Sequence, residues 1–173
     1  ALKFRFVNLD SAKYYINKAD IEAEALNDDY YKALLLSTKG IFASETGNFD
    51  EALKYYEQAT PEIEASNNHS AIGSLYTNIS NVYERTGKID EAVKVLLEGL
   101  KHYKIANDSV WIAGSYVNLG NKYKVIKETN LAIESYLKAK DLYKQLGNQY
   151  YEGFVDNNIA NTYVFADDFE KSL

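Results

Sequence analysis

Three asparagine-rich stretches carry the most distinctive polar chemistry in the chain. They read NISNVY at 78–83, NLGNKY at 118–123 and NIANTY at 158–163, so the pattern returns every 40 residues. An asparagine amide offers one carbonyl acceptor and two N–H donors, which suits the backbone of an extended peptide whatever its side chains. Alternatively, the amides bridge neighbouring helices or face water. The first interpretation predicts a protein that binds peptides.

Residues suited to catalysis or metal binding are sparse by comparison. The chain has no cysteine, and its two histidines, His69 and His102, fall on different predicted elements. Neither a zinc site nor a cysteine–histidine pair is therefore expected. The neighbouring carboxylates Asp28–Asp29 and Asp167–Asp168 lie at predicted turns, where aspartate commonly caps a helix. Because the sequence also has no glycine-rich phosphate loop, we expect no catalysis, no metal and no cofactor.

The charge of the chain limits its partners. A net charge of −6 argues against nucleic acid as a partner, because phosphate binding needs clustered lysine and arginine. Residues 41–80 are the most acidic part and contain Lys54 as their only basic side chain. They could attract a basic partner surface, although a solvated helix face explains the same residues. No run of about 18 to 20 apolar residues predicts insertion into a membrane, and the composition fits cytoplasm and periplasm equally.

The asparagine segments belong to a 40-residue repeat that extends over the chain. Residues able to end a helix in the left-handed conformation recur at Asn27, Asn67, Asn107 and Gly147. Good helix N-caps recur at Asp10, Asp50, Asp90 and Asn130. Small residues recur at Ala12, Ala52, Ala92 and Ala132, and larger apolar or aromatic ones at Ile16, Tyr56, Leu96 and Tyr136. Each unit therefore reads as two helices.

Short turns leave these two helices room only for antiparallel packing, so the predicted unit is a helical hairpin in an all-α fold. The first helices are predicted at 30–46, 70–86, 110–126 and 150–166, and the second at 10–26, 50–66, 90–106 and 130–146. The units comprise a partial one at 1–27, repeats at 28–67, 68–107 and 108–147, and an incomplete one at 148–173. Pro61 lies inside a predicted helix, and we expect a bend near 57–61.

The stretch GIFASETGNFDEALKYYEQA at 40–59 resembles the tetratricopeptide repeat family, with Gly40, Gly47, Ala52, Tyr56 and Ala59 at its glycine, small and aromatic positions. The period of 40 departs from the family's usual length of about 34. It is similar to that of the long-repeat relatives of kinesin light chain and of bacterial peptide-sensing receptors. The family's proline near the end of the second helix is missing. The resemblance implies an α-solenoid that winds as a right-handed superhelix and holds a peptide or protein segment in its concave groove.

The resemblance also implies which residues line the groove, since the first helix of each hairpin forms the concave wall in this family. The corresponding positions are Ser37, Thr38 and Ile41, then Thr77, Asn78 and Asn81, then Val117, Asn118 and Asn121, then Asn157, Asn158 and Asn161. The asparagines would form a ladder along the ligand. Arg85 and Lys124 lie one turn further on and could bind one acidic ligand side chain. The paired basic residues of a carboxylate clamp are replaced by Ser37, Ser74 and Gly114.

The end of the chain leaves several alternatives open. Phe154, Val164 and Phe165 form either an apolar pocket or a surface on which a further hairpin docks. ADDFEKSL at 166–173 begins another second helix, so we expect a longer protein, or a second copy bound at this exposed end. Trp111 and the tyrosines are expected in the core and the groove. Two further hypotheses are a structural or oligomerisation scaffold, and a regulatory segment, since NLDSAKYYINKA at 8–19 resembles repeats preceding bacterial sensor kinases and regulators.

Overall fold

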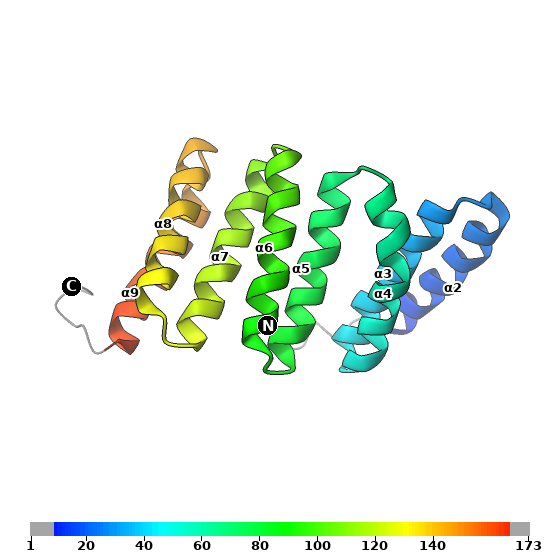
Figure 1. The fold of residues 1–173 in the computed structure, drawn as a ribbon, viewed down its shortest axis with the longest axis horizontal. Coiled ribbons are helices and arrows are strands. Elements are labelled where there is room, and N and C mark those ends of the chain that lie inside the picture. The colour runs from blue at the N-terminus through cyan, green and yellow to red at the C-terminus, as the bar shows by residue number, and fades with distance from the viewer. Residues whose placement is uncertain (1–8, 167–173) are drawn as a thin grey trace. The chain divides into compact units, whose positions relative to one another are not determined.

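Eight helices make up residues 9–166, which are the part of the chain described by this computed structural model (Figure 1). They are α2 (Leu9–Leu26), α3 (Asp29–Glu45), α4 (Phe49–Ala65), α5 (His69–Arg85), α6 (Ile89–Ile105), α7 (Ser109–Val125), α8 (Thr129–Gln145) and α9 (Gln149–Phe165). From α3 onward every helix has 17 residues. The helix boundaries predicted from the sequence agree with these boundaries within one residue. The helix expected to begin in 167–173, with Asp167 and Asp168, lies outside the described residues.

The chain divides into two units, residues 1–75 and 76–173, and the division falls inside α5. In the first unit, α3 packs against α2 on one side and α4 on the other. In the second unit, α7 packs against α6 and α8, and α8 packs against α9. Within each unit these helices therefore pack against neighbours in sequence, as expected for hairpins stacked in series.

Three-residue turns fix the spacing from α3 onward because each contains a residue in the left-handed conformation. This residue is a glycine with φ of 85°, 78° and 67° at Gly47, Gly87 and Gly147, and an asparagine at Asn67 and Asn107. The next N–H bonds back to the carbonyl five residues earlier, as from Asn48 to Ala43 at 2.8 Å. This pattern satisfies the last carbonyls of the preceding helix. The predicted helix ends at Asn27, Asn67, Asn107 and Gly147 all have positive φ, as expected.

Lys127 occupies the same turn position with φ of 62°, where Gly47 and Gly87 stand in the other hairpins. A lysine pays a steric penalty in this conformation that glycine avoids. We therefore expect Lys127→Gly to raise the free energy of unfolding by about 0.5 to 1 kcal/mol in urea titrations. The reverse change, Gly87→Lys, is the matched control and should lower it by a similar amount. A neutral result for both variants would contradict this explanation of the turn.

Helix N-caps differ between the two helices of a hairpin, which corrects part of the sequence prediction. The first helices have side-chain caps, as at Asp28, whose Oδ1 accepts from Tyr30 N at 2.9 Å. The second helices have none at their cap positions, which are Asn48, Lys88 and Glu128. The prediction that Asp10, Asp50, Asp90 and Asn130 are N-caps is therefore wrong, since each lies after its helix has begun. Asp50 and Asp90 lie in the first turn, where a negative charge favours the helix dipole.

Small residues allow the two helices of a hairpin to approach closely. Ala52, Ala92 and Ala132 are fully buried. A Cβ atom added at Gly40 or Gly120 would lie 2.5 Å from a ring carbon of Tyr56 or Tyr136, respectively. The hairpin of α5 and α6 has Ser80 and Leu96 at these positions, so a larger residue on one helix faces a smaller one on the other.

The helix α4 continues through Pro61 to Ala65. The hydroxyl of Thr60 donates to the carbonyl of Tyr56 at 2.7 Å, one turn before the proline. The bend that the sequence predicts near 57–61 stays a prediction.

Candidate functional site

Two stacked aromatic pairs mark the junctions between hairpins in the second unit. Tyr103 and Trp111 stack with ring centroids 5.7 Å apart and an interplanar angle of 9°. Tyr143 and Tyr151 stack at 4.9 Å and 17°. Each pair joins the end of a second helix to the first turn of the next helix, because a three-residue turn reverses the chain between residues eight apart. The same contact thus recurs after 40 residues.

Side chains of the turns cap the helices that carry the outer ring of each pair. Asp108 accepts a hydrogen bond from Trp111 N at 3.3 Å, and Asn148 accepts one from Tyr151 N at 3.3 Å. The inner rings of Tyr103 and Tyr143 are buried, whereas Trp111 and Tyr151 are 52% and 43% exposed. Two exposed rings are therefore fixed on a buried base before any partner binds.

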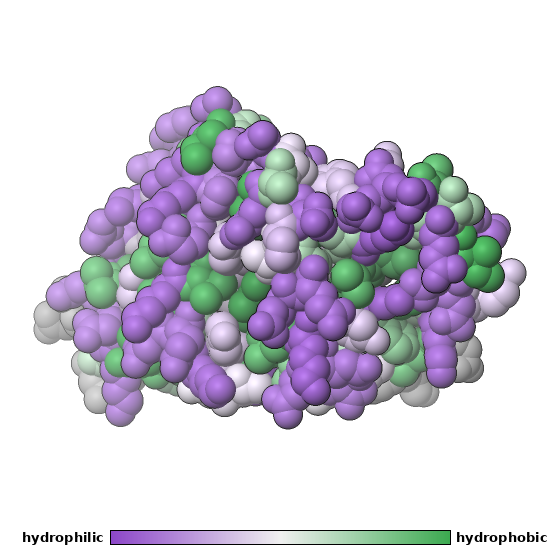
Figure 2. Space-filling model, turned by 45° about the vertical axis from the view of Figure 1, so that its right-hand side comes forward, coloured by the Kyte–Doolittle hydropathy of each residue, from purple (hydrophilic) through white to green (hydrophobic). Residues whose placement is uncertain are grey.

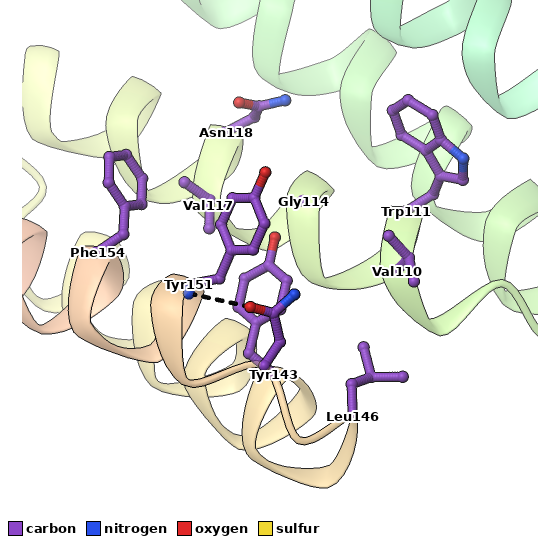
Figure 3. A pocket seen from close by; sticks show the side chains of 10 residues that line it. Val110, Trp111, Gly114, Val117, Asn118, Tyr143, Leu146, Tyr151 and Phe154 are labelled. Carbon is purple, nitrogen blue, oxygen red and sulfur yellow. Dashed lines mark hydrogen bonds between the residues drawn. The ribbon is translucent and has the colours of Figure 1, made fainter.

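A cavity of about 490 Å³ opens beside these rings (Figure 3). It is lined by Val110, Trp111, Gly114, Val117 and Asn118 of α7, Tyr143 of α8, Leu146 and Asn148 of the following turn, and Tyr151 and Phe154 of α9. None of these residues carries a charge. A concave, mostly apolar site with a few polar groups is the usual form of a ligand-binding pocket.

Figure 3 shows how the lining residues are arranged. The rings of Tyr143 and Tyr151 lie between Phe154 on one side and Trp111 on the other, with Leu146 below Trp111. A Cβ atom added at Gly114 would meet nothing nearer than the Tyr143 hydroxyl at 4.0 Å. Glycine at this position therefore keeps the cavity open, because a side chain there would occupy its volume.

Three asparagines of the predicted ladder, at equivalent positions of successive repeats, lie in different surroundings. Asn118 lines the cavity, and Asn78 and Asn158 are half-buried at the equivalent positions of α5 and α9. Among the described residues, Asn158 Nδ2 is buried and has no hydrogen-bond partner. Of these three asparagines, Asn118 is the one that lines the cavity described above.

Asn121 has a structural contact. Its Oδ1 accepts a hydrogen bond from the hydroxyl of Tyr136 at 2.7 Å, which ties α7 to α8. Burial raises the pKa of Tyr136 to about 12, so its hydroxyl stays protonated and donates at neutral pH. The alternative that an amide bridges neighbouring helices therefore holds for Asn121.

The remaining predicted groove residues divide by exposure. Asn81, Arg85, Asn157 and Asn161 are exposed, and Lys124 is half-buried. Thr77 is buried, and its place in the groove stays a prediction.

The apolar pocket predicted from Phe154, Val164 and Phe165 stays a prediction, and two of these residues line different cavities. Phe154 lines the cavity beside Trp111, whereas Phe165 lines a second cavity of about 540 Å³ near the end of α9. The second cavity also includes Lys124, whose Nζ lies 5.8 Å from the centre of the Phe165 ring. Val164 is exposed and lines neither cavity.

A buried ion pair joins α7 to α5 and was not predicted from the sequence. Lys122 of α7 is 1% exposed and donates to Glu84 of α5 at 2.5 Å. The equivalent residues in the neighbouring repeats are Val82 and Thr162, both buried. The signal available in the sequence was a lysine at a position that is valine or threonine in the neighbouring repeats.

Comparison with known proteins agrees with this architecture. Residues 31–105 match the family model of the tetratricopeptide repeat, which identifies these repeats in the chain. The structure is similar to the crystal structure of BtubC (BKLC) from P. vanneervenii, with a TM-score of 0.83. That match has 19% sequence identity and covers 99% of this chain and 71% of that chain, so it shows the fold alone. The comparison with curated proteins found no match.

The predicted family is thereby confirmed over residues 31–105, and the all-α solenoid fold class is confirmed by the structure. Tetratricopeptide repeats generally mediate protein interactions and are typically not catalytic. Across residues 9–166, none of the helices has the length and apolar character required to cross a membrane. Figure 2 shows a face on which hydrophobic side chains are scattered among hydrophilic ones.

Proposed function

We propose that the second unit binds a protein segment by taking a large, uncharged apolar side chain into the cavity between Trp111 and Phe154. The observation that supports this most strongly is the uncharged aromatic lining of that cavity, with Trp111 and Tyr151 partly exposed. Aromatic residues dominate the energetics of protein recognition because they bury a large area with few rotatable bonds.

The fixed rings also favour binding through entropy. Trp111 and Tyr151 already stack on Tyr103 and Tyr143, so a ligand does not have to order them. Binding to a preorganised surface avoids the entropic cost of immobilising side chains. Asn118 at the cavity can donate to and accept from the ligand backbone beside the inserted side chain.

The uncharged lining of the cavity favours an apolar ligand side chain over the acidic one that the sequence suggested. No charged residue lines the cavity, so an acidic side chain there would lose water without gaining a partner of opposite charge. The basic candidates are elsewhere, with Lys124 at the second cavity and Arg85 near the end of α5. An acidic residue of the ligand would therefore contact a different part of the surface from the apolar anchor.

The test is selection of peptides from a displayed random library by the intact chain, followed by titration calorimetry. We expect selected peptides to share a large apolar residue, and Trp111→Ala to weaken their binding by about 10- to 100-fold. Tyr14→Ala, which removes an exposed aromatic ring on α2, is the control and should leave affinity unchanged.

Melting temperatures measured on the same preparations separate binding from folding. Selected peptides with no common apolar residue, or wild-type affinity in a folded Trp111→Ala variant, would contradict the proposed site. Failure to select any peptide would favour the scaffold hypothesis instead.

A further inference from the structure

Lysines of α6 and α8 meet around one aromatic ring of α7. The Nζ of Lys104 lies 5.4 Å from the centre of the Tyr116 ring, and the Nζ of Lys138 lies 5.7 Å from the same centre. The helix α7, which carries Tyr116, packs against both α6 and α8. Because an aromatic ring attracts cations, Tyr116 holds two ammonium groups from different helices at one place on the surface.

A cavity of about 370 Å³ extends this cluster along α6. It is lined by Lys94, Leu97, Glu98, Leu100, Lys101 and Lys104. Leu100 is buried and Leu97 is 37% exposed, so the lysines surround an apolar floor. We call the surface formed by this cavity together with Lys138 the lysine face.

The positive charge of the lysine face is only partly neutralised within the chain. Lys101 is paired with Glu98 at 2.7 Å, and Lys138 is paired with Glu134 at 2.6 Å. Lys94 and Lys104 are exposed, and neither forms an ion pair within residues 9–166. These two ammonium groups therefore remain without a carboxylate, in a chain whose net charge is −6.

The repeat itself does not require this charge, because the equivalent helix of the first unit is acidic. Forty residues before Leu97 and Lys104, the helix α4 has Glu57 and Glu64. Glu57 and Glu64 are exposed, as Leu97 and Lys104 are. The fold thus accepts either sign of charge at these positions, and lysine there changes the surface without changing the packing.

We propose that the lysine face binds an acidic protein segment, with carboxylates at Lys94 and Lys104 and an apolar side chain over Leu97. Lysine attracts a carboxylate as a point charge, without the fixed geometry that arginine imposes. Lys94 and Lys104 are ten residues apart on one helix, which corresponds to about 15 Å. An extended segment of about five residues spans this length.

The apolar floor favours a polypeptide over a nucleic acid, because a phosphate backbone has no apolar side chain to place over Leu97. The net charge of the chain also opposes an extended anionic surface, such as DNA or an anionic membrane. Salt screens that charge over about 8 to 10 Å, so a short segment interacts mainly with the nearby lysines. The lysine face shares no residue with the cavity beside Trp111, and the inference is independent of the proposed function.

The experiment is a fluorescence polarisation titration of a labelled synthetic peptide of alternating glutamate and leucine with the full chain. We expect saturable binding at about 20 mM salt and weaker binding at about 300 mM salt, because the exposed charges are screened. The double variant Lys94→Glu with Lys104→Glu should weaken binding by roughly 5- to 50-fold, since each change replaces an attraction by a repulsion. Melting temperatures should stay unchanged, because both side chains are exposed.

Two further variants locate the binding surface. Lys54→Glu is the matched control, since Lys54 is the exposed lysine of α4 at the repeat position of Lys94, and it should bind the peptide as the wild type does. Trp111→Ala should also bind normally. Loss of binding in Trp111→Ala, with normal binding in the double variant, would place the peptide in the aromatic cavity. That result would overturn this inference and leave the proposed function standing.

Other outcomes would also overturn the proposal. They are absence of saturable binding at low salt, equal affinities of the wild type and the double variant, and an equal loss of binding in Lys54→Glu. Tighter binding of a DNA oligonucleotide or of phosphatidylserine vesicles than of the peptide would assign the lysine face to a different class of partner. Self-association of the chain that the double variant abolishes, without peptide binding, would assign it to a second copy.

Discussion

Gly120→Ala is expected to lower the free energy of unfolding by about 1 to 3 kcal/mol, although alanine is the better helix former. The added Cβ would lie 2.5 Å from Cε1 and 2.7 Å from Cδ1 of Tyr136. Tyr136 is fully buried and its hydroxyl is bonded to Asn121, so the ring cannot move away without losing that bond. Urea titration monitored by circular dichroism measures the change.

Two companion variants distinguish this clash from a general effect of replacing glycine. Gly153→Ala is the control, because a Cβ at Gly153 in α9 meets no atom within 4 Å. It should stabilise by about 0.5 to 1 kcal/mol through helix propensity. The double variant Gly120→Ser with Tyr136→Leu reproduces the Ser80 and Leu96 pair. It should cost less than the two single changes added together, and strict additivity would contradict the packing described here.

Glu84→Ala is expected to destabilise the protein by about 1 to 3 kcal/mol, because it leaves the buried ammonium of Lys122 without its partner. The two groups lie 2.5 Å apart, and Lys122 is 1% exposed. Removal of one member of a fully buried pair costs about 3 to 5 kcal/mol. The expected loss is smaller here because Glu84 is 36% exposed and water can approach the vacated site.

Two controls locate the cause of that loss. Glu134→Ala breaks the exposed pair with Lys138, whose side chains are 59% and 50% exposed, and should cost less than about 0.5 kcal/mol. Lys122→Met removes the buried charge while keeping most of the volume, and should be within about 1 kcal/mol of the wild type. Equal losses for Glu84→Ala and Glu134→Ala would show that burial of Lys122 contributes nothing.

Most of the helical architecture could be predicted because the repeat signal is local. Asn67 and Asn107 adopt the left-handed conformation and are the middle residues of three-residue turns between helices. The N-cap error arose because aspartate favours both the cap and the first turn. Asp50 and Asp90 occupy the first turn, and sequence alone does not distinguish these positions.

The site was predicted only in part, because its contacts join residues on different helices. Asn118 was assigned to the groove from its position and lines the cavity, while Asn121, three residues later, is bonded to Tyr136. The partner of Asn121 lies 15 residues away on the next helix, so the period of a single helix does not reveal it. The stacked pairs do have a signal, since Tyr103 and Tyr143 are each followed eight residues later by an aromatic residue.

The most direct test of the proposed function is a heteronuclear NMR titration of the full chain with a peptide selected as described above. We expect the largest shifts at the Trp111 indole N–H, the Gly114 backbone and the Asn118 side-chain amide, together with Tyr151. Trp111→Ala should remove the shifts at Gly114 and Asn118 at the same peptide concentration. Shifts confined to the outer surfaces of α6 and α8, with Gly114 and Asn118 unchanged, would contradict it.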